Sequence, residues 1–145
     1  MLRFALLASI VLVCLASLSC QSFTEGVKEG AKRGNEAGAT GTLRSIATVQ
    51  QTYAVSNGGN YGTFEQLAAG SYLDSSFNSD KPVVNQYIFT MEVGSAAEGP
   101  YFRCHADPTG QTVQGARHFY MDSSSSAFHV NPTQPASPSD PIVQP

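Results

Sequence analysis

Apolar side chains recur at helical spacing in the segment that begins at residue 43. The apolar positions are Leu43, Ile46, Ala47, Tyr53 and Ala54, and the polar positions Arg44, Gln50 and Gln51 fall elsewhere on the helical wheel. The run Asn57-Gly58-Gly59-Asn60 is a strong stop signal for a helix. The pattern therefore predicts one amphipathic helix over residues 43–56.

The following pattern predicts a short helix and then a series of strands. Thr63 and Gln66 have capping-box spacing, and Gly70 suits the end of a short helix. Beyond it, apolar and polar residues alternate with the period of two that is typical of strands, at residues 84–93, 101–106, 116–122 and 127–130. One long helix packed on an antiparallel sheet of about four strands is an α+β domain. We expect the helix to cover Phe89, Met91, Phe102 and Phe119.

A charge-free apolar run occupies residues 4–18, after a short basic start at Arg3. Its length is typical of a signal peptide, because a membrane-spanning helix needs about 20 apolar residues. The run ends in Ser19-Cys20, which resembles a bacterial lipobox in a permissive form. Residues 1–19 are therefore interpreted as a signal peptide, and Cys20 as the lipid-modified first mature residue. Ordinary cleavage near Ser19 and an uncleaved anchor helix are the alternatives.

Lipid on Cys20 would hold the mature protein at a membrane, because each buried CH₂ of an acyl chain contributes about 0.8 kcal/mol. Gln21 stands where an Asp is associated with retention in the inner membrane. We therefore expect a cell-envelope lipoprotein of the outer membrane, facing the periplasm or the cell surface. Loss of Cys14 with the signal peptide would leave Cys104 alone, and we expect it to be a buried, small apolar residue.

Two segments that flank the predicted domain have unusual compositions. Glycines recur every four residues at 26, 30, 34 and 38. Residues 20–42 are interpreted as a flexible or half-helical tether, and a packing helix with a glycine face is the alternative. Residues 131–145 hold five prolines, so we expect a disordered, unpacked tail whose removal changes the melting temperature little. The α+β domain is thus assigned to residues 43–130.

The composition and the histidines argue against several kinds of site. Charged residues make up 13% of the 145-residue chain, its net charge is −3, and its Lys and Arg residues are scattered. Nucleic acid is therefore an unsuitable partner, since phosphate binding needs clustered basic side chains. The strand pattern places His105, His118 and His129 on the solvent face of one sheet. No pair of them has the local spacing of a zinc site, so we expect no metal.

Other polar residues have a simple structural interpretation. Asp74, Asn78 and Asp80 offer oxygen atoms to a calcium ion, but their spacing lacks the EF-hand pattern, and a turn stabilised by Asx hydrogen bonds is the preferred interpretation. Cys104 and His105 are adjacent and point to opposite faces of a strand, so they cannot form a nucleophile–base pair. We expect no catalytic residue, no cofactor and no small-molecule substrate.

Residues 43–130 resemble the globular region of type IV pilins and of the pseudopilins of type II secretion. The segments that carry the resemblance are Tyr53-Ala54-Val55-Ser56-Asn57-Gly58, Tyr61-Gly62-Thr63-Phe64-Glu65-Gln66-Leu67, Gly70-Ser71-Tyr72-Leu73-Asp74, Tyr87-Ile88-Phe89-Thr90-Met91, Ala106-Asp107-Pro108 and Arg117-His118-Phe119-Tyr120-Met121-Asp122. Such pilins carry a peptidase-cleaved leader and then an apolar helix, which anchors the protein and forms the filament core. Phe23-Thr24-Glu25 resembles only weakly the start of that helix. Lipid on Cys20 would replace the membrane anchor that the apolar helix supplies in pilins.

These observations together predict a non-enzymatic, lipid-anchored, pilin-like protein of the bacterial cell envelope. Its partners would be the membrane, through Cys20, and other envelope or filament proteins. A structural subunit of an extracellular filament or secretion pseudopilus is the first alternative. A metal- or thiol-dependent enzyme of the envelope is the second.

Overall fold

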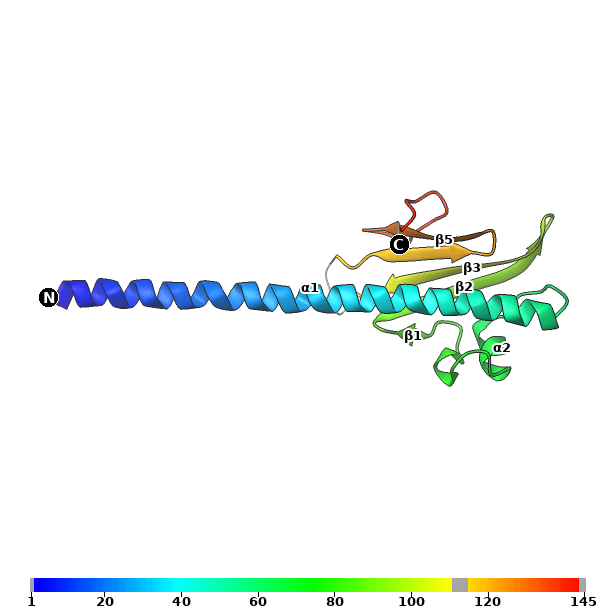
Figure 1. The fold of residues 1–145 in the computed structure, drawn as a ribbon, viewed down its shortest axis with the longest axis horizontal. Helices are drawn as coiled ribbons and strands as arrows, with labels where there is room; N and C mark the ends of the chain where they lie inside the picture. The colour runs from blue at the N-terminus through cyan, green and yellow to red at the C-terminus, as the bar shows by residue number, and fades with distance from the viewer. Residues whose placement is uncertain (1, 111–114, 144–145) are drawn as a thin grey trace.

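The computed structural model describes the backbone of residues 2–110 and 115–143, and the side chains of residues 24–110, 115–125 and 127–143. It consists of one long helix, a short helix with a 3₁₀ turn, and an antiparallel sheet with the strand order β1-β2-β3-β4-β5 (Figure 1). The elements are α1 (Leu2–Ser56), α2 (Phe64–Ala69), η1 (Ser75–Phe77), β1 (Val83–Val84), β2 (Tyr87–Ala96), β3 (Gly99–Pro108), β4 (His118–Asp122) and β5 (Ser125–Asn131). The expected α+β class is confirmed.

The sheet has five strands, so the expected count of about four is wrong. Residues 84–93 were expected to form one strand, but the chain reverses at Asn85 and Gln86, whose φ angles are 51° and 64°. Two successive residues with positive φ are typical of a tight two-residue hairpin turn. Val84 therefore pairs back onto Tyr87, and a short extra strand forms at the edge of the sheet.

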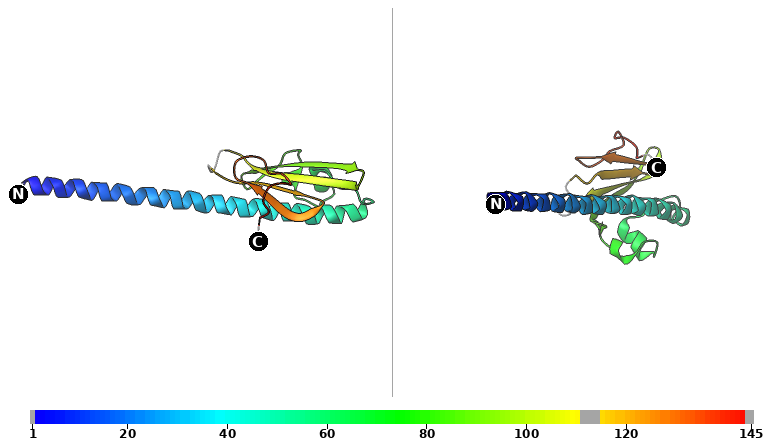
Figure 2. Two further views of the ribbon diagram at one scale, coloured as in Figure 1. Left: turned by 90° about the horizontal axis from the view of Figure 1, so that it is seen from above. Right: turned by 60° about the vertical axis from the view of Figure 1, so that its left-hand side comes forward.

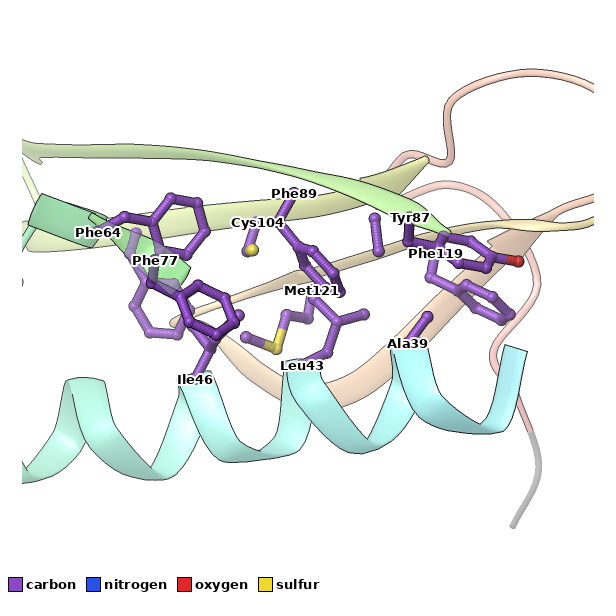
Figure 3. Packing of buried hydrophobic residues seen from close by; sticks show 12 residues of the cluster. Ala39, Leu43, Ile46, Phe64, Phe77, Tyr87, Phe89, Cys104, Phe119 and Met121 are labelled. Atoms are coloured by element: carbon purple, nitrogen blue, oxygen red, sulfur yellow. The ribbon is translucent and has the colours of Figure 1, made fainter. Parts of the chain in front are cut away.

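The core lies between α1 and one face of the sheet (Figure 3). Leu43 and Ile46 of α1 have no exposed surface and pack against the inward-facing residues of the strands, which include Phe89, Phe102 and Phe119. The expected contact between the apolar face of the helix and these strand residues is thus confirmed. Phe64 of α2 and Phe77 of η1 close the same core from the side.

Gln50 belongs to the buried face of α1, although its polarity suggested an exposed position. Its side chain has no exposed surface. Its amide nitrogen donates to the carbonyl oxygen of Gly62 at 2.6 Å, and its amide oxygen accepts from the Gly62 backbone nitrogen at 2.9 Å. A buried amide is tolerated because both of its ends are hydrogen-bonded. The pair fixes the loop that leads from α1 into α2.

The described part of the glycine-rich segment is helical in this structure and continues into the packed part of α1 (Figure 1). Residues 24–31 are all exposed and extend beyond the sheet in each view (Figure 2). We call residues 24–34 the stem. Packing begins at Glu36 and Ala39, so the globular domain starts several residues before the expected position 43.

Ion pairs between neighbouring turns support the exposed stem helix. Glu25 lies 3.4 Å from Lys28, and Glu29 lies 3.8 Å from Lys32 and 3.3 Å from Arg33. Pairs at these spacings stabilise a helix by about 0.2–0.5 kcal/mol each. They partly offset the helix-destabilising effect of the exposed glycines.

The C-terminal segment is packed on β5, so the expected disordered tail is wrong for residues 132–143. The Val130 backbone nitrogen donates to the Pro141 oxygen at 2.9 Å, and the Val143 nitrogen donates to the Phe128 oxygen at 2.7 Å. Ala136 is 1% exposed. The prolines are spaced so that the backbone between them still pairs with the edge of the sheet.

Asp140 holds the bend of this C-terminal segment. Its carboxylate accepts hydrogen bonds from the Ser137 nitrogen at 2.7 Å, from the Ser137 hydroxyl at 2.8 Å and from the Asn131 amide at 2.9 Å. The Ser137 hydroxyl and backbone bonds lower the pKa of Asp140, because they stabilise the ionised carboxylate. A proline-rich composition conceals these local polar contacts.

Replacing Ile46 with Asp should unfold the domain, because an unpaired carboxylate would be buried in the only apolar core of the described chain. We expect a loss of at least about 3–4 kcal/mol in the free energy of unfolding. Ser45→Asp is the matched control, since Ser45 is exposed one position away. Thermal melting followed by circular dichroism checks both variants, and an Ile46→Asp protein that melts like the control would contradict the helix-on-sheet core.

Replacing Ala136 with Asp should destabilise the domain by about 1–3 kcal/mol, because the carboxylate would be placed at a buried position of the C-terminal segment. The melting temperature should fall by about 4–8 °C for each kcal/mol. Gln134→Asp, at an exposed position in the same segment, should have little effect. Equal melting temperatures for the two variants would mean that the segment is unpacked in solution.

Candidate functional site

A groove of about 450 Å³ lies between α1 and the hairpin formed by β4 and β5. Its floor is apolar, and its two rims are polar. The floor residues are Ala47, Tyr61, Phe102, Met121 and Phe128, and the rim residues are Arg44, Thr48 and Gln51 on α1 and Asp122, Ser123, Ser124 and Ser125 on the hairpin. A pocket of this size, with an apolar floor and a few polar groups, is the usual form of a binding site.

The hairpin rim is built by Asp122 at the end of β4. Asp122 pairs with Ser125 across the turn. One of its carboxylate oxygens accepts from the Ser124 backbone nitrogen at 2.9 Å and from the Ser124 hydroxyl at 2.6 Å, and the other accepts from the Tyr120 hydroxyl at 2.8 Å. Burial alone would raise the pKa of Asp122, but the bonds from Ser124 and Tyr120 outweigh it and lower the pKa. The carboxylate is thus ionised and its oxygens are occupied.

Arg44 forms the opposite rim and has no acidic partner in the part of the chain that the structure describes. Its guanidinium lies 5.1 Å from the centre of the Phe128 ring, which is a cation–π distance. The other arginines whose side chains the structure describes are each paired with a glutamate: Arg33 with Glu29, Arg103 with Glu92 and Arg117 with Glu36. Arg44 is therefore a positioned cation whose hydrogen-bond donors are free. Sequence analysis placed it on the polar side of the helix but did not identify it as a site residue.

His105 and His129 lie on one face of the sheet, on either side of Tyr120. The ring centres of His105 and His129 are 5.0 Å and 6.0 Å from that of Tyr120. The shared face was expected, but its description as a solvent face is wrong, since Tyr120 is 2% exposed and both histidines are half-buried. The reason is that the C-terminal segment packs beside this face, where the His129 Nδ1 atom lies 2.7 Å from the backbone carbonyl oxygen of Asp140.

His118 lies on the same face and is held by Asp107, whose carboxylate is 2.6 Å from its Nδ1 atom. The Nδ1 atom of His105 is buried and has no hydrogen-bond partner. Within the described residues, no three side chains of the His, Cys, Asp or Glu type gather in a way that could hold a metal ion. The three histidines therefore belong to the packing of the sheet face and do not form a common site.

The loop with Asp74, Asn78 and Asp80 is a hydrogen-bonded turn. The Asp74 carboxylate accepts from the Ser76 backbone nitrogen at 2.9 Å and caps the helical turn η1. This bond lowers the pKa of Asp74, because it stabilises the charged form. Asn78 ends the same turn, and Asp80 is exposed. The prediction of a turn stabilised by Asx hydrogen bonding is confirmed at Asp74.

Cys104 is buried in the core, as expected. Burial raises the pKa of its thiol well above the ordinary value, so the reactive thiolate does not form near neutral pH. Its sulfur packs between the helix and the sheet (Figure 3). The residue therefore fills space and supplies no nucleophile.

The predicted lipid attachment at Cys20 and the predicted signal peptide at residues 1–19 lie outside the residues whose side chains are described. From Thr24 onward, where side chains are described, α1 offers no segment that is long and apolar enough to cross a membrane.

One partly buried ion pair fixes the base of the stem. Both the Nε and a terminal guanidinium nitrogen of Arg117 donate to one carboxylate oxygen of Glu36, at 3.0 Å and 2.7 Å. The other oxygen accepts from the Arg117 backbone nitrogen at 3.1 Å. The Glu36 side chain is 7% exposed, whereas that of Arg117 is 44% exposed. The pair joins α1 to the chain just before β4 and sets the direction in which the stem leaves the domain.

Sequence analysis missed Glu36, although a signal was present. Glu36, Ala39, Leu43, Ile46 and Gln50 are spaced by alternating steps of three and four residues, and all are buried on one helix face. Glycines and charges dominate the turns before residue 43 and obscure the continuation of this pattern. Arg117 gave no comparable signal, since its partner is distant in the chain.

Replacing Arg117 with Ala should destabilise the domain more than replacing Glu36 with Ala. The first change leaves a buried carboxylate with only its backbone partner, whereas the second leaves an arginine that reaches water. We expect about 1–3 kcal/mol for Glu36→Ala and a larger loss for Arg117→Ala. Urea denaturation measures both, and Arg33→Ala on the exposed stem is the control. The reverse order would mean that the carboxylate is not buried in solution.

Comparison with other proteins does not add to this description. No family model matches the sequence, and neither the curated proteins nor the solved structures include a match.

Proposed function

We propose that this chain is a non-enzymatic, lipid-anchored, pilin-like protein of the bacterial cell envelope that acts by binding another protein. The observation that carries the proposal is the division of α1 into a packed part and an exposed stem. Its C-terminal part is packed on the sheet, and its exposed stem leads toward Cys20, where the sequence resembles a lipobox. A lipid at that end of a helical stem would present the domain at a distance from the membrane, where a protein partner in the surrounding space could reach it.

The pilin-like part of the proposal is supported by the order of the elements. A long helix is followed by a short helix and a loop, and then by an antiparallel meander that packs on the C-terminal half of the long helix. The segments that resemble pilins supply core residues of each part, such as Leu67, Phe89 and Phe119. The stem of this chain is polar and charged, so a lipid at Cys20 would take the anchoring role of an apolar pilin helix.

A binding role is supported by the groove between α1 and the β4–β5 hairpin. Its floor is apolar, and its rim holds the guanidinium of Arg44, which forms no ion pair with a described residue. The thiol of Cys104, which would be the nucleophile of a thiol enzyme, is buried beneath the helix. These features favour recognition over catalysis.

A filament or pseudopilus subunit is the alternative, and the stem glycines favour it. A Cβ atom placed on Gly26, Gly30 or Gly34 would meet nothing within 4 Å, so the folded chain has no steric need for glycine there. Each glycine destabilises an exposed helix by about 1 kcal/mol relative to alanine. Close approach of a second helix would explain them, and filaments of purified protein in electron micrographs would support this alternative.

Replacing Cys20 with Ser should release the protein from membranes or leave its precursor unprocessed, because the acyl chains could no longer be attached. Fractionation of cells followed by mass spectrometry of the mature N-terminus is the measurement. Cys14→Ser, within the predicted signal peptide, is the control and should leave membrane association unchanged. A mature protein that begins with a free, unmodified N-terminus would exclude the lipid anchor.

A further inference from the structure

We propose that the groove between α1 and the β4–β5 hairpin binds an acidic peptide segment of a partner protein. A carboxylate of the peptide pairs with Arg44, and a neighbouring apolar side chain occupies the floor. This inference rests on the proposed role in protein binding, and it adds the place and the chemistry of recognition.

The first argument is the state of Arg44. Its guanidinium is held over the Phe128 ring, yet it makes no hydrogen bond or ion pair with the described residues. Stacking on a ring leaves the N–H groups at the edge of the guanidinium free, and this planar edge matches a carboxylate in a two-bond geometry. The other described arginines already have glutamate partners. Arg44 is thus oriented for an anion that the described residues do not supply.

The second argument is the charge of the opposite rim. Asp122 keeps its negative charge, but the donors of Ser124 and Tyr120 lie against its oxygens and partly offset that charge. The hydroxyl oxygens of Ser123 and Ser125 accept bonds from the backbone nitrogens of Phe102 and Ala127, at 3.3 Å and 3.0 Å. Their hydroxyl hydrogens remain available as donors. The rim therefore offers donors to carbonyl and carboxylate oxygens.

The third argument is the floor, which selects a peptide with an apolar side chain beside its acid. Tyr61 packs edge-on against Phe102 with ring centres 4.9 Å apart. Met121 and Phe128 lie beside them in the same groove. Aromatic and methionine surfaces next to an arginine are typical of the energetically important centre of a protein interface. The groove volume of about 450 Å³ limits the bound segment to a short one.

The proposal is tested with the full-length, ¹⁵N-labelled protein in detergent and two dipeptide probes, N-acetyl-Phe-Glu-amide and N-acetyl-Phe-Gln-amide. The glutamate probe should shift the backbone amide signals of residues around Arg44 and of Ser123 to Ser125. It should bind about tenfold more tightly than the glutamine probe, because only its charged carboxylate pairs with the guanidinium. Equal affinities, or shifts confined to other surfaces, would overturn the proposal.

Variants of the protein identify the group that distinguishes the charged glutamate probe from the neutral glutamine probe. Arg44→Gln should abolish the difference between the two probes, and Arg44→Lys should retain part of it, because a lysine keeps the charge but not the planar edge. Arg33→Gln, which removes an exposed arginine of the stem, should leave both affinities unchanged. A preference for the glutamate probe that survives in Arg44→Gln would remove Arg44 from the site.

A third probe separates a peptide from a small acid. If 3-phenylpropanoate binds the groove as tightly as the glutamate dipeptide, the site recognises small carboxylic acids and the peptide assignment is wrong. Crosslinking in intact envelopes then separates this inference from the proposed function. If the parent and Arg44→Gln capture a partner equally, only the assignment of the groove as the binding site is contradicted. If the parent protein captures no partner, the proposed binding function itself is contradicted.

Discussion

The structure depends on the packing of one face of α1 against the inner face of the sheet. Leu43 and Ile46 provide the apolar contact of the helix, and Phe64 and Phe77 close the same core beside it. Polar contacts fix the helix at both ends of this face. Glu36 pairs with Arg117 near the stem, and Gln50 binds the backbone of Gly62 near the end of the helix. Apolar packing is non-directional, so these polar contacts determine the position of the helix along the sheet.

The position of the helix determines the candidate site. With Leu43 and Ile46 directed into the core, Arg44 and Thr48 necessarily lie on the neighbouring face, next to the β4–β5 hairpin. The tight turn after Asp122 brings Phe128 back beneath Arg44, and the space between them becomes the groove. The proposed recognition of an acidic segment and the stability of the fold thus depend on the same helix, although on different faces of it.

The stem and the C-terminal segment extend the domain in two ways. The stem continues α1 beyond the sheet as a polar helix supported by ion pairs between its own turns. The C-terminal segment returns to the edge of β5, where it pairs with Phe128 and Val130 and covers a strand edge that would otherwise be open. If Cys20 carries lipid, as we propose, the stem sets the direction of the domain relative to the membrane.

The sequence alone determined the elements whose cause is local. The helical spacing of Leu43 and Ile46, the alternation around Phe89 and the capping box of Thr63 each predicted an element that the structure contains. Distant contacts decided the rest. Gln50 is buried because Gly62 satisfies its amide, residues 132–143 are ordered because the edge of β5 accepts them, and Arg44 becomes notable only when Phe128 lies beneath it. Polarity and proline content describe a residue by itself, whereas burial depends on whether another part of the chain supplies its hydrogen-bond partner.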